Sequence, residues 1–129
     1  MMVDVAVAKK KVMIVEDSDE IRKRIKGLLS ELKNISVIAE ADCATDAIKF
    51  GAKYLPEVMI LDINLLGNDT GFLVLKEMKK ILPALITIVL PNFSTPQYKI
   101  KSAELGADYF FDKSNEFNEM VNTLKQFEN

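Results

Sequence analysis

Five short apolar runs alternate with five helix-patterned segments along this chain, and few folds accommodate that alternation. The apolar runs cover residues 11–15, 36–40, 58–61, 85–90 and 108–111. Apolar residues at helical spacing occur over residues 19–32, 44–51, 72–81, 100–105 and 117–127. Runs this short and apolar are typical of strands buried on both faces of a parallel sheet. Because parallel strands need helical, right-handed crossovers, the pattern predicts an α/β fold with helices on both faces of the sheet.

Local signals mark the ends of some of these helices. Ser18 stands where a hydroxyl can cap the first helix, and Asp19 and Glu20 follow in its first turn, where acids are favourable. The basic residues within 22–26 predict a solvated outer face of this helix. Gly106 predicts a C-terminal cap on the fourth helix. Residues 1–10 show no clear period, so we predict a flexible lead-in followed by one domain over residues 11–129.

Composition excludes several classes of function. A chain of 129 residues fits one domain with a single core. The absence of histidine excludes His-activated nucleophiles and His metal sites. The net charge of −2 suggests neither nucleic-acid binding nor an anionic-membrane surface. No apolar stretch approaches the ~20 residues of a membrane span. The single cysteine, Cys43, and the lack of a secretory signal pattern predict a cytoplasmic location.

Charged side chains follow three of the predicted strands. Glu16 and Asp17 follow the first strand, Asp62 the third and Lys113 the fifth. In a flavodoxin-like, doubly wound sheet of order 2-1-3-4-5, the first and third strands are neighbours and ligands bind at the carboxyl ends. The three acids are therefore expected to share one crevice. Clustered carboxylates need raised pKa values or a cation, and oxygen ligands without His or Cys favour Mg²⁺. A carboxylate in such a crevice can also attack phosphorus.

Segments 12–18, 60–64 and 103–113 resemble the receiver domain of two-component response regulators, and the resemblance extends over residues 11–127. It implies a protein that accepts a phosphoryl group from a sensor histidine kinase or a phosphotransfer protein. It also implies Mg²⁺ as the cofactor and signalling through contact with a downstream protein, with no direct contact to nucleic acid or membrane. Any enzymatic activity would be limited to self-phosphorylation and autophosphatase activity.

The resemblance implies a role for each residue of the crevice. Asp62 is the phospho-acceptor, and Lys113 pairs with its carboxylate or its phosphate. Asp17 is the direct Mg²⁺ ligand, Glu16 acts on the ion through water, and the backbone carbonyl of Asn64 completes the protein ligands.

Two switch positions depart from what activation in the family requires. The family places Thr or Ser at the end of the fourth strand, but this chain has Pro91, which offers neither a hydroxyl nor an N–H. Ser94 and Thr95, a few residues further on, are candidates to replace that hydroxyl. Phe110 occupies the position of the switch aromatic residue and has no hydroxyl either. We therefore expect phosphoryl acceptance with weak or altered switching.

Other departures lie in loops. Leu66 replaces the usual proline after the acceptor, and Gly71 comes about one residue late. Ser114 replaces the proline that usually follows the lysine. We therefore expect the usual cis peptide bond before that proline to be lost as well.

Two other functions fit part of the pattern. A phosphorylation-independent receiver-like module would dock a protein through the last two helices and the strand between them. Pro91 favours that reading, and the preserved acids argue against it. A Mg²⁺-dependent phosphatase with an aspartyl nucleophile usually has a second Asp, two residues later, as its general acid. That position holds Asn64, which cannot donate a proton in this way.

Overall fold

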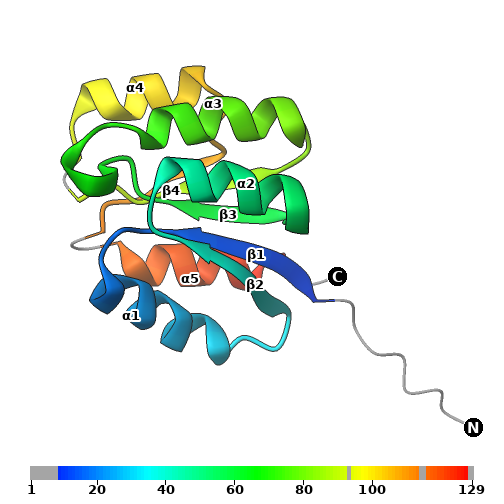
Figure 1. Ribbon diagram of the computed structural model, residues 1–129. Coiled ribbons are helices and arrows are strands. Elements are labelled where there is room, and N and C mark those ends of the chain that lie inside the picture. The colour runs from blue at the N-terminus through cyan, green and yellow to red at the C-terminus, as the bar shows by residue number, and fades with distance from the viewer. Residues whose placement is uncertain (1–8, 93, 114–115, 128–129) are drawn as a thin grey trace, which may run out of the picture.

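The computed structural model describes residues 9–92, 94–113 and 116–127. Within them, five parallel strands form one sheet in the order β2-β1-β3-β4-β5 (Figure 1). The strands are β1 (Lys10–Val15), β2 (Ile35–Ala41), β3 (Val58–Leu61), β4 (Ile86–Val89) and β5 (Tyr109–Phe110). The helices are α1 (Asp19–Ser30), α2 (Ala44–Tyr54), α3 (Gly71–Ile81), α4 (Pro96–Glu104) and α5 (Phe117–Lys125), with a short 3-10 turn, η1 (Leu65–Gly67). The predicted flavodoxin-like fold is confirmed.

Helices cover both faces of the sheet, and each face has its own apolar core. Helices α2, α3 and α4 lie on one side, and α1 and α5 lie on the other (Figure 1). Successive strand residues point to opposite sides, so Met59 joins the core under α3 while Ile60 joins the core above α1 and α5. None of the helices in the described ranges is long and apolar enough to cross a membrane.

The helix ends follow the sequence signals, with one start missed. The Ser18 side chain caps α1 by accepting the Ile21 N–H, and Gly106 follows α4 with a φ of 98°, a left-handed conformation that favours glycine. Helix α4 begins at Pro96, four residues before Ile100, the first apolar residue of its predicted helical pattern, because the Thr95 side chain caps it and a proline is favourable in the first turn. Strand β1 begins at Lys10, one residue before the predicted strand. Residues 1–8 of the predicted lead-in lie outside the described ranges.

Strand pairing brings the ends of β1 and β3 together. Val15 is the register partner of Leu61, so the residues that follow each strand emerge side by side. The Asp62 N–H continues the ladder by donating to the Val15 carbonyl at 2.9 Å. The carboxyl edge of the sheet therefore holds Asp62 next to the acids that follow β1.

Gly71 fixes the loop after Asp62 from its far end. Its N–H donates to the Ile63 carbonyl at 2.9 Å, so the start of α3 lies directly against the backbone that follows Asp62. A Cβ at position 71 would meet the Asp62 carbonyl oxygen and would lie 2.5 Å from Ile63 Cα. Because these are backbone atoms, the contact cannot be relieved by a side-chain rotation.

We predict that Gly71→Ala lowers the free energy of unfolding by about 1–3 kcal/mol, the range for an overpacked site. The measurement is urea denaturation followed by circular dichroism. Gly27→Ala is the matched control, since a Cβ there meets nothing within 4 Å. It should stabilise α1 by about 0.5–1 kcal/mol. Equal stability of Gly71→Ala and the wild type would contradict the close approach.

Candidate functional site

Three acidic side chains meet at the carboxyl edge of the sheet. Carboxylate oxygens of Glu16, Asp17 and Asp62 lie within 4.8 Å of one another. Glu16 is 1% exposed and Asp62 is 2% exposed, so two of the three charges are almost fully removed from water. Like charges this close and this buried repel strongly, and the fold must supply positive charge or hydrogen-bond donors to hold them.

Lys113 supplies positive charge from the loop after β5. Its ammonium donates to Glu16 Oε1 at 2.5 Å and lies 3.4 Å from Asp62 Oδ2. It also donates to Asn92 Oδ1 at 2.7 Å. The Lys113 side chain is 7% exposed, so these pairs form with little competition from water. Sequence reasoning anticipated Lys113 beside the acids but missed Asn92, a polar residue with no motif around it.

Backbone N–H groups hold the acids in place. The second oxygen of Glu16, Oε2, accepts the Ser18 N–H at 3.0 Å, and Asp62 Oδ1 accepts the Asn64 N–H at 3.1 Å. Asp62 Oδ2 is buried and has no hydrogen-bond partner among the described residues. Asp62 therefore keeps one oxygen uncommitted beside the Lys113 ammonium.

Burial raises the pKa of both buried acids. The pKa of Glu16 rises from 4.5 to about 7, although hydrogen bonds from Lys113 and the Ser18 N–H act to lower it. Burial also raises the pKa of Asp62, against the lowering effects of the Lys113 charge and the Asn64 N–H. One ammonium is therefore not enough to offset the desolvation of these carboxylates.

Arg22 supports the turn that carries the acidic pair. Its Nη1 donates to the Glu16 carbonyl at 2.7 Å, and its guanidinium pairs with Glu40 at 3.1 Å and with Asp19. The predicted solvated face of α1 is thus wrong for this residue, whose side chain is 17% exposed. The reason is that β2 places Glu40 within reach of α1, which helical periodicity alone cannot indicate.

The residues present fit a hard divalent cation. The donor set is made of carboxylates without nitrogen or sulfur, which suits Mg²⁺. The raised pKa values and the uncommitted Asp62 oxygen are what a site short of positive charge would show. Asp17 and Asp62 would hold the ion, with Glu16 nearby but already bonded through both oxygens. The role of the Asn64 carbonyl stays a prediction.

The loop after Asp62 has a further anchor on α4. The Asn64 side-chain amide donates to Asp69 Oδ1 at 2.8 Å and to the Tyr98 hydroxyl at 3.1 Å. The Tyr98 hydroxyl also donates to Asp69 at 3.0 Å. No sequence pattern indicated these contacts of the Asn64 side chain. They connect the loop after Asp62 to the first turn of α4.

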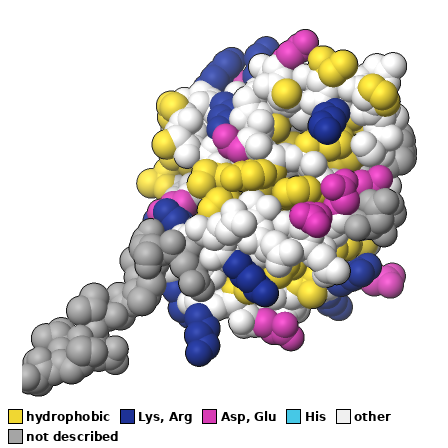
Figure 2. Space-filling model, turned by 180° about the vertical axis from the view of Figure 1, so that it is seen from behind, with side chains coloured by type: hydrophobic (Ala, Val, Ile, Leu, Met, Phe, Trp, Pro, Cys, Tyr) yellow, Lys and Arg dark blue, Asp and Glu magenta, His cyan; other side chains and the backbone are white. Residues whose placement is uncertain are grey.

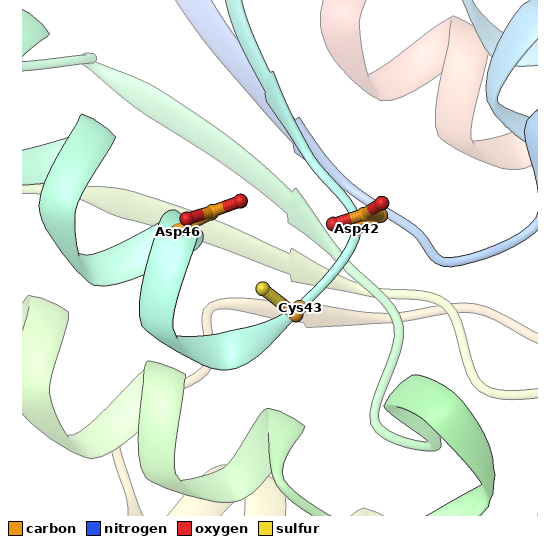
Figure 3. Close-up of side chains that lie close together, drawn as sticks. All are labelled: Asp42, Cys43 and Asp46. Carbon is orange, nitrogen blue, oxygen red and sulfur yellow. The ribbon is translucent and has the colours of Figure 1, made fainter.

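A second group of possible metal ligands lies at the start of α2. Asp42, Cys43 and Asp46 have ligand atoms within 4.8 Å of one another (Figure 3). All three are exposed or half-buried. Exposed acids at a helix N-terminus are stabilised by the helix dipole alone, so this group needs no ion to explain it.

The chain is similar in sequence to proteins of one known family. The family model for the response regulator receiver domain matches residues 12–125. The chain belongs to the response regulator receiver family. It is similar to the sensory transduction protein LytT of Bacillus anthracis, with 33% identity over 121 residues that cover 91% of this chain and 46% of LytT.

Two solved structures are similar to this receiver. A LuxR-family DNA-binding response regulator from Staphylococcus aureus has a TM-score of 0.82 and 28% identity, covering 93% of this chain and 99% of that one. The response regulator domain of Thermotoga maritima CheB has a TM-score of 0.79, with 92% of each chain covered, and its 20% identity supports the fold alone. This receiver spans about half the length of the first curated relatives that it matches.

The structure explains one departure of this receiver from its family. Leu66, where the usual proline is missing, has a φ of 52°, a left-handed conformation that a proline ring cannot adopt. Its N–H donates to Asp17 Oδ2 at 3.0 Å, a bond that proline could not make. The conformation of this loop therefore requires a residue other than proline at position 66, and the N–H of that residue positions Asp17.

The switch positions also have defined surroundings. Pro91 is buried, and its carbonyl accepts the Lys113 N–H at 3.4 Å. Phe110 is half-buried against the core under α3. The Thr95 hydroxyl, a candidate replacement for the missing switch hydroxyl, accepts the Tyr98 N–H as the cap of α4. Ser114 lies outside the described residues.

We predict that stability in metal-free buffer falls as pH rises from 5.5 to 7.5. Between its ordinary pKa of 4.5 and its folded value of about 7, Glu16 binds a proton in the folded state that the unfolded state has lost. That stabilisation is present at low pH and is lost as pH rises through about 7, by about 1–2 kcal/mol after allowance for solvent screening. No histidine contributes to this range.

Urea denaturation with a chelator present measures this slope. Glu16→Gln should flatten the slope, and Mg²⁺ should raise the stability of the wild type most at pH 7.5. Glu20→Gln, which removes an exposed acid, is the control. A wild-type stability that is constant or rises with pH would show that burial does not dominate at Glu16.

We predict that Leu66→Pro destabilises the receiver by about 1 kcal/mol or more, because proline cannot adopt the native φ. Leu66→Asn keeps the N–H and tolerates the left-handed conformation, so it should remain close to the wild type. Thermal unfolding of the two variants makes the comparison. Equal unfolding temperatures of Leu66→Pro and Leu66→Asn would contradict the assigned backbone conformation.

Proposed function

We propose that this receiver, located in the cytoplasm, accepts a phosphoryl group onto Asp62 from the phosphohistidine of a sensor histidine kinase or phosphotransfer protein. The observation that carries the proposal is the meeting of Asp62 with Glu16, Asp17 and Lys113 at one edge of the sheet. A buried carboxylate beside an ammonium and two further acids suits phosphoryl chemistry, in which positioning and charge supply most of the catalysis.

The transfer forms one bond and breaks one. A carboxylate oxygen of Asp62 bonds to phosphorus as the bond between phosphorus and the imidazole nitrogen breaks, and that electron pair stays on the nitrogen. Asp62 Oδ2, which has no hydrogen-bond partner among the described residues, is the oxygen best prepared to attack. The product is an acyl phosphate. Water attack on its phosphorus returns the free carboxylate and inorganic phosphate, which is the only turnover that we expect of this chain.

The neighbouring side chains stabilise the charge that arrives. The Lys113 ammonium, 3.4 Å from Asp62 Oδ2, is placed to donate to a phosphoryl oxygen. Asp17 and Asp62 would hold Mg²⁺, and Glu16 would lie nearby without binding the ion directly. When bound, the ion offsets negative charge on the phosphoryl oxygens. The Leu66 N–H and the Ser18 N–H keep Asp17 and Glu16 oriented toward the crevice.

The output surface that we propose is the side of α4, β5 and α5. On this side Ile100 is 59% exposed, and the Tyr109 ring stacks on Phe111 with centroids 6.0 Å apart. Figure 2 shows the molecule from behind, where the β5 edge lies, with hydrophobic side chains across the middle of the face. A downstream protein is the partner that such a surface suits. The absence of direct nucleic-acid contact stays a prediction.

No observation favours the two other functions. Pro91 alone suggested a phosphorylation-independent module, and such a module would not need a buried acceptor paired with an ammonium. An aspartyl phosphatase would need a general acid at position 64. The side chain there is an amide bonded to Asp69 and Tyr98.

We predict that acetyl phosphate with Mg²⁺ adds about 80 Da to the wild type, as expected for one phosphoryl group. Intact-mass spectrometry measures the adduct. Asp62→Asn should show no adduct, and a chelator should remove most of the wild-type signal. Asp46→Asn is the matched control, because Asp46 belongs to the separate acidic group at α2 and should not matter. A wild type without any adduct, or an equal adduct on Asp62→Asn, would refute the assignment.

A further inference from the structure

We propose that Asn92 is a positioning residue that acts through Lys113 and connects the charge at Asp62 to the loop between β4 and α4. Asn92 would replace the switch hydroxyl that the buried Pro91, the residue before it, cannot provide. The proposal rests on the proposed transfer to Asp62 and names how that event is passed on. Its first support is the 2.7 Å hydrogen bond from the Lys113 ammonium to Asn92 Oδ1.

The ammonium lies close to three oxygens of different charge. Glu16 and Asn92 accept hydrogen bonds from it at 2.5 Å and 2.7 Å, and Asp62 Oδ2 lies 3.4 Å away. Glu16 and Asp62 carry carboxylates, whereas the acceptor of Asn92 is a neutral amide oxygen. A full negative charge attracts the ammonium more strongly than the partial charge of an amide oxygen. The bond to Asn92 is therefore the one that yields most easily when charge at the site changes.

A phosphoryl group on Asp62 changes that charge. It brings about −1.5 to −2 units of charge and several strong acceptor oxygens close to the ammonium. Glu16 and Asn92 accept two of the three N–H donors of Lys113. Phosphoryl oxygens at Asp62 can take the third donor and draw the ammonium toward their negative charge, away from the neutral Asn92 oxygen. We infer that phosphorylation weakens or redirects the bond between Lys113 and Asn92.

Because Asn92 lies between β4 and α4, a change in its bond to Lys113 would affect the start of α4. Asn92 directly follows Leu90 and Pro91, so its side chain is the first polar side chain after β4. The residue is exposed, which leaves its carboxamide free to reorient. Helix α4 begins only four residues later, at Pro96. The Thr95 hydroxyl is less suited to the same task, since it caps α4 by accepting the Tyr98 N–H.

The test uses the whole chain, labelled with ¹⁵N, with Mg²⁺ and trifluoroberyllate, an anion that bonds to a carboxylate and imitates a phosphoryl group. Amide signals of Asp62 to Asn64 report binding of the mimic, and those of residues 96–104 report the response of α4. The mimic is added until the first set stops changing, so that a change in affinity does not affect the comparison. Asn92→Ala is compared with the wild type and with Gln97→Ala, which removes an exposed carboxamide from α4 itself.

In the wild type and in Gln97→Ala, both sets of signals should shift. In Asn92→Ala the first set should still shift, while the shift of the α4 signals should fall, up to about tenfold if one charge-assisted hydrogen bond carries the coupling. Asn92→Asp offers Lys113 a charged acceptor that yields less easily than the amide, so its α4 response should also fall. A full α4 response in Asn92→Ala or in Asn92→Asp would overturn the role of the neutral Asn92 oxygen.

The outcome also separates this inference from the proposed function. A wild type in which the Asp62 to Asn64 signals do not respond would refute the acceptor site itself. Signals that respond there, without any change in α4, would leave the acceptor site standing and refute only the coupling through Asn92.

Discussion

The closeness of Glu16, Asp17 and Asp62 is the constraint on which the rest of this receiver depends. Burying the carboxylates of Glu16 and Asp62 is unfavourable, as their raised pKa values indicate, and the repulsion between acids within 4.8 Å of one another adds to that cost. The fold offsets that cost in two ways. Two apolar cores, one on each face of the sheet, stabilise the strands that deliver the acids. Donors from separate segments then hold each carboxylate in a fixed direction.

The loop after Asp62 shows how apparent departures from a family pattern can form one consistent structure. In the sequence, Leu66 in place of proline and Gly71 one residue after the usual glycine position are two separate departures from the family pattern. In the structure, Leu66 turns through a left-handed conformation and gives its N–H to Asp17. Gly71 then lies against the backbone of Asp62 and Ile63. Both features keep the acceptor in register with the acids that follow β1.

The sequence predicted most of the architecture because hydrophobic periodicity and strand ends are local signals. The crossover rule predicted helices on both faces, and the strand order of a flavodoxin-like sheet placed Asp62 beside Glu16 and Asp17. The start of α4 was not marked by periodicity, because its first turn has no apolar stripe, only a cap and a proline. The contacts of Asn92 with Lys113 and of Asn64 with Tyr98 could not be predicted. Each joins polar side chains from distant segments, and no period or spacing marks such pairs.

The distribution of these contacts indicates where a response to phosphorylation can occur. On the β1 and β3 side, Asp62 is held through the backbone, by the bond to Val15 and by the contact of Gly71 with the acceptor loop. Backbone bonds within a sheet do not rearrange without loss of the ladder. On the β4 side, the link is made by side chains, chiefly Lys113 with Asn92. Side-chain bonds exchange partners by rotation about single bonds, at much lower cost. We therefore expect charge added at Asp62 to be accommodated on the side of β4 and α4.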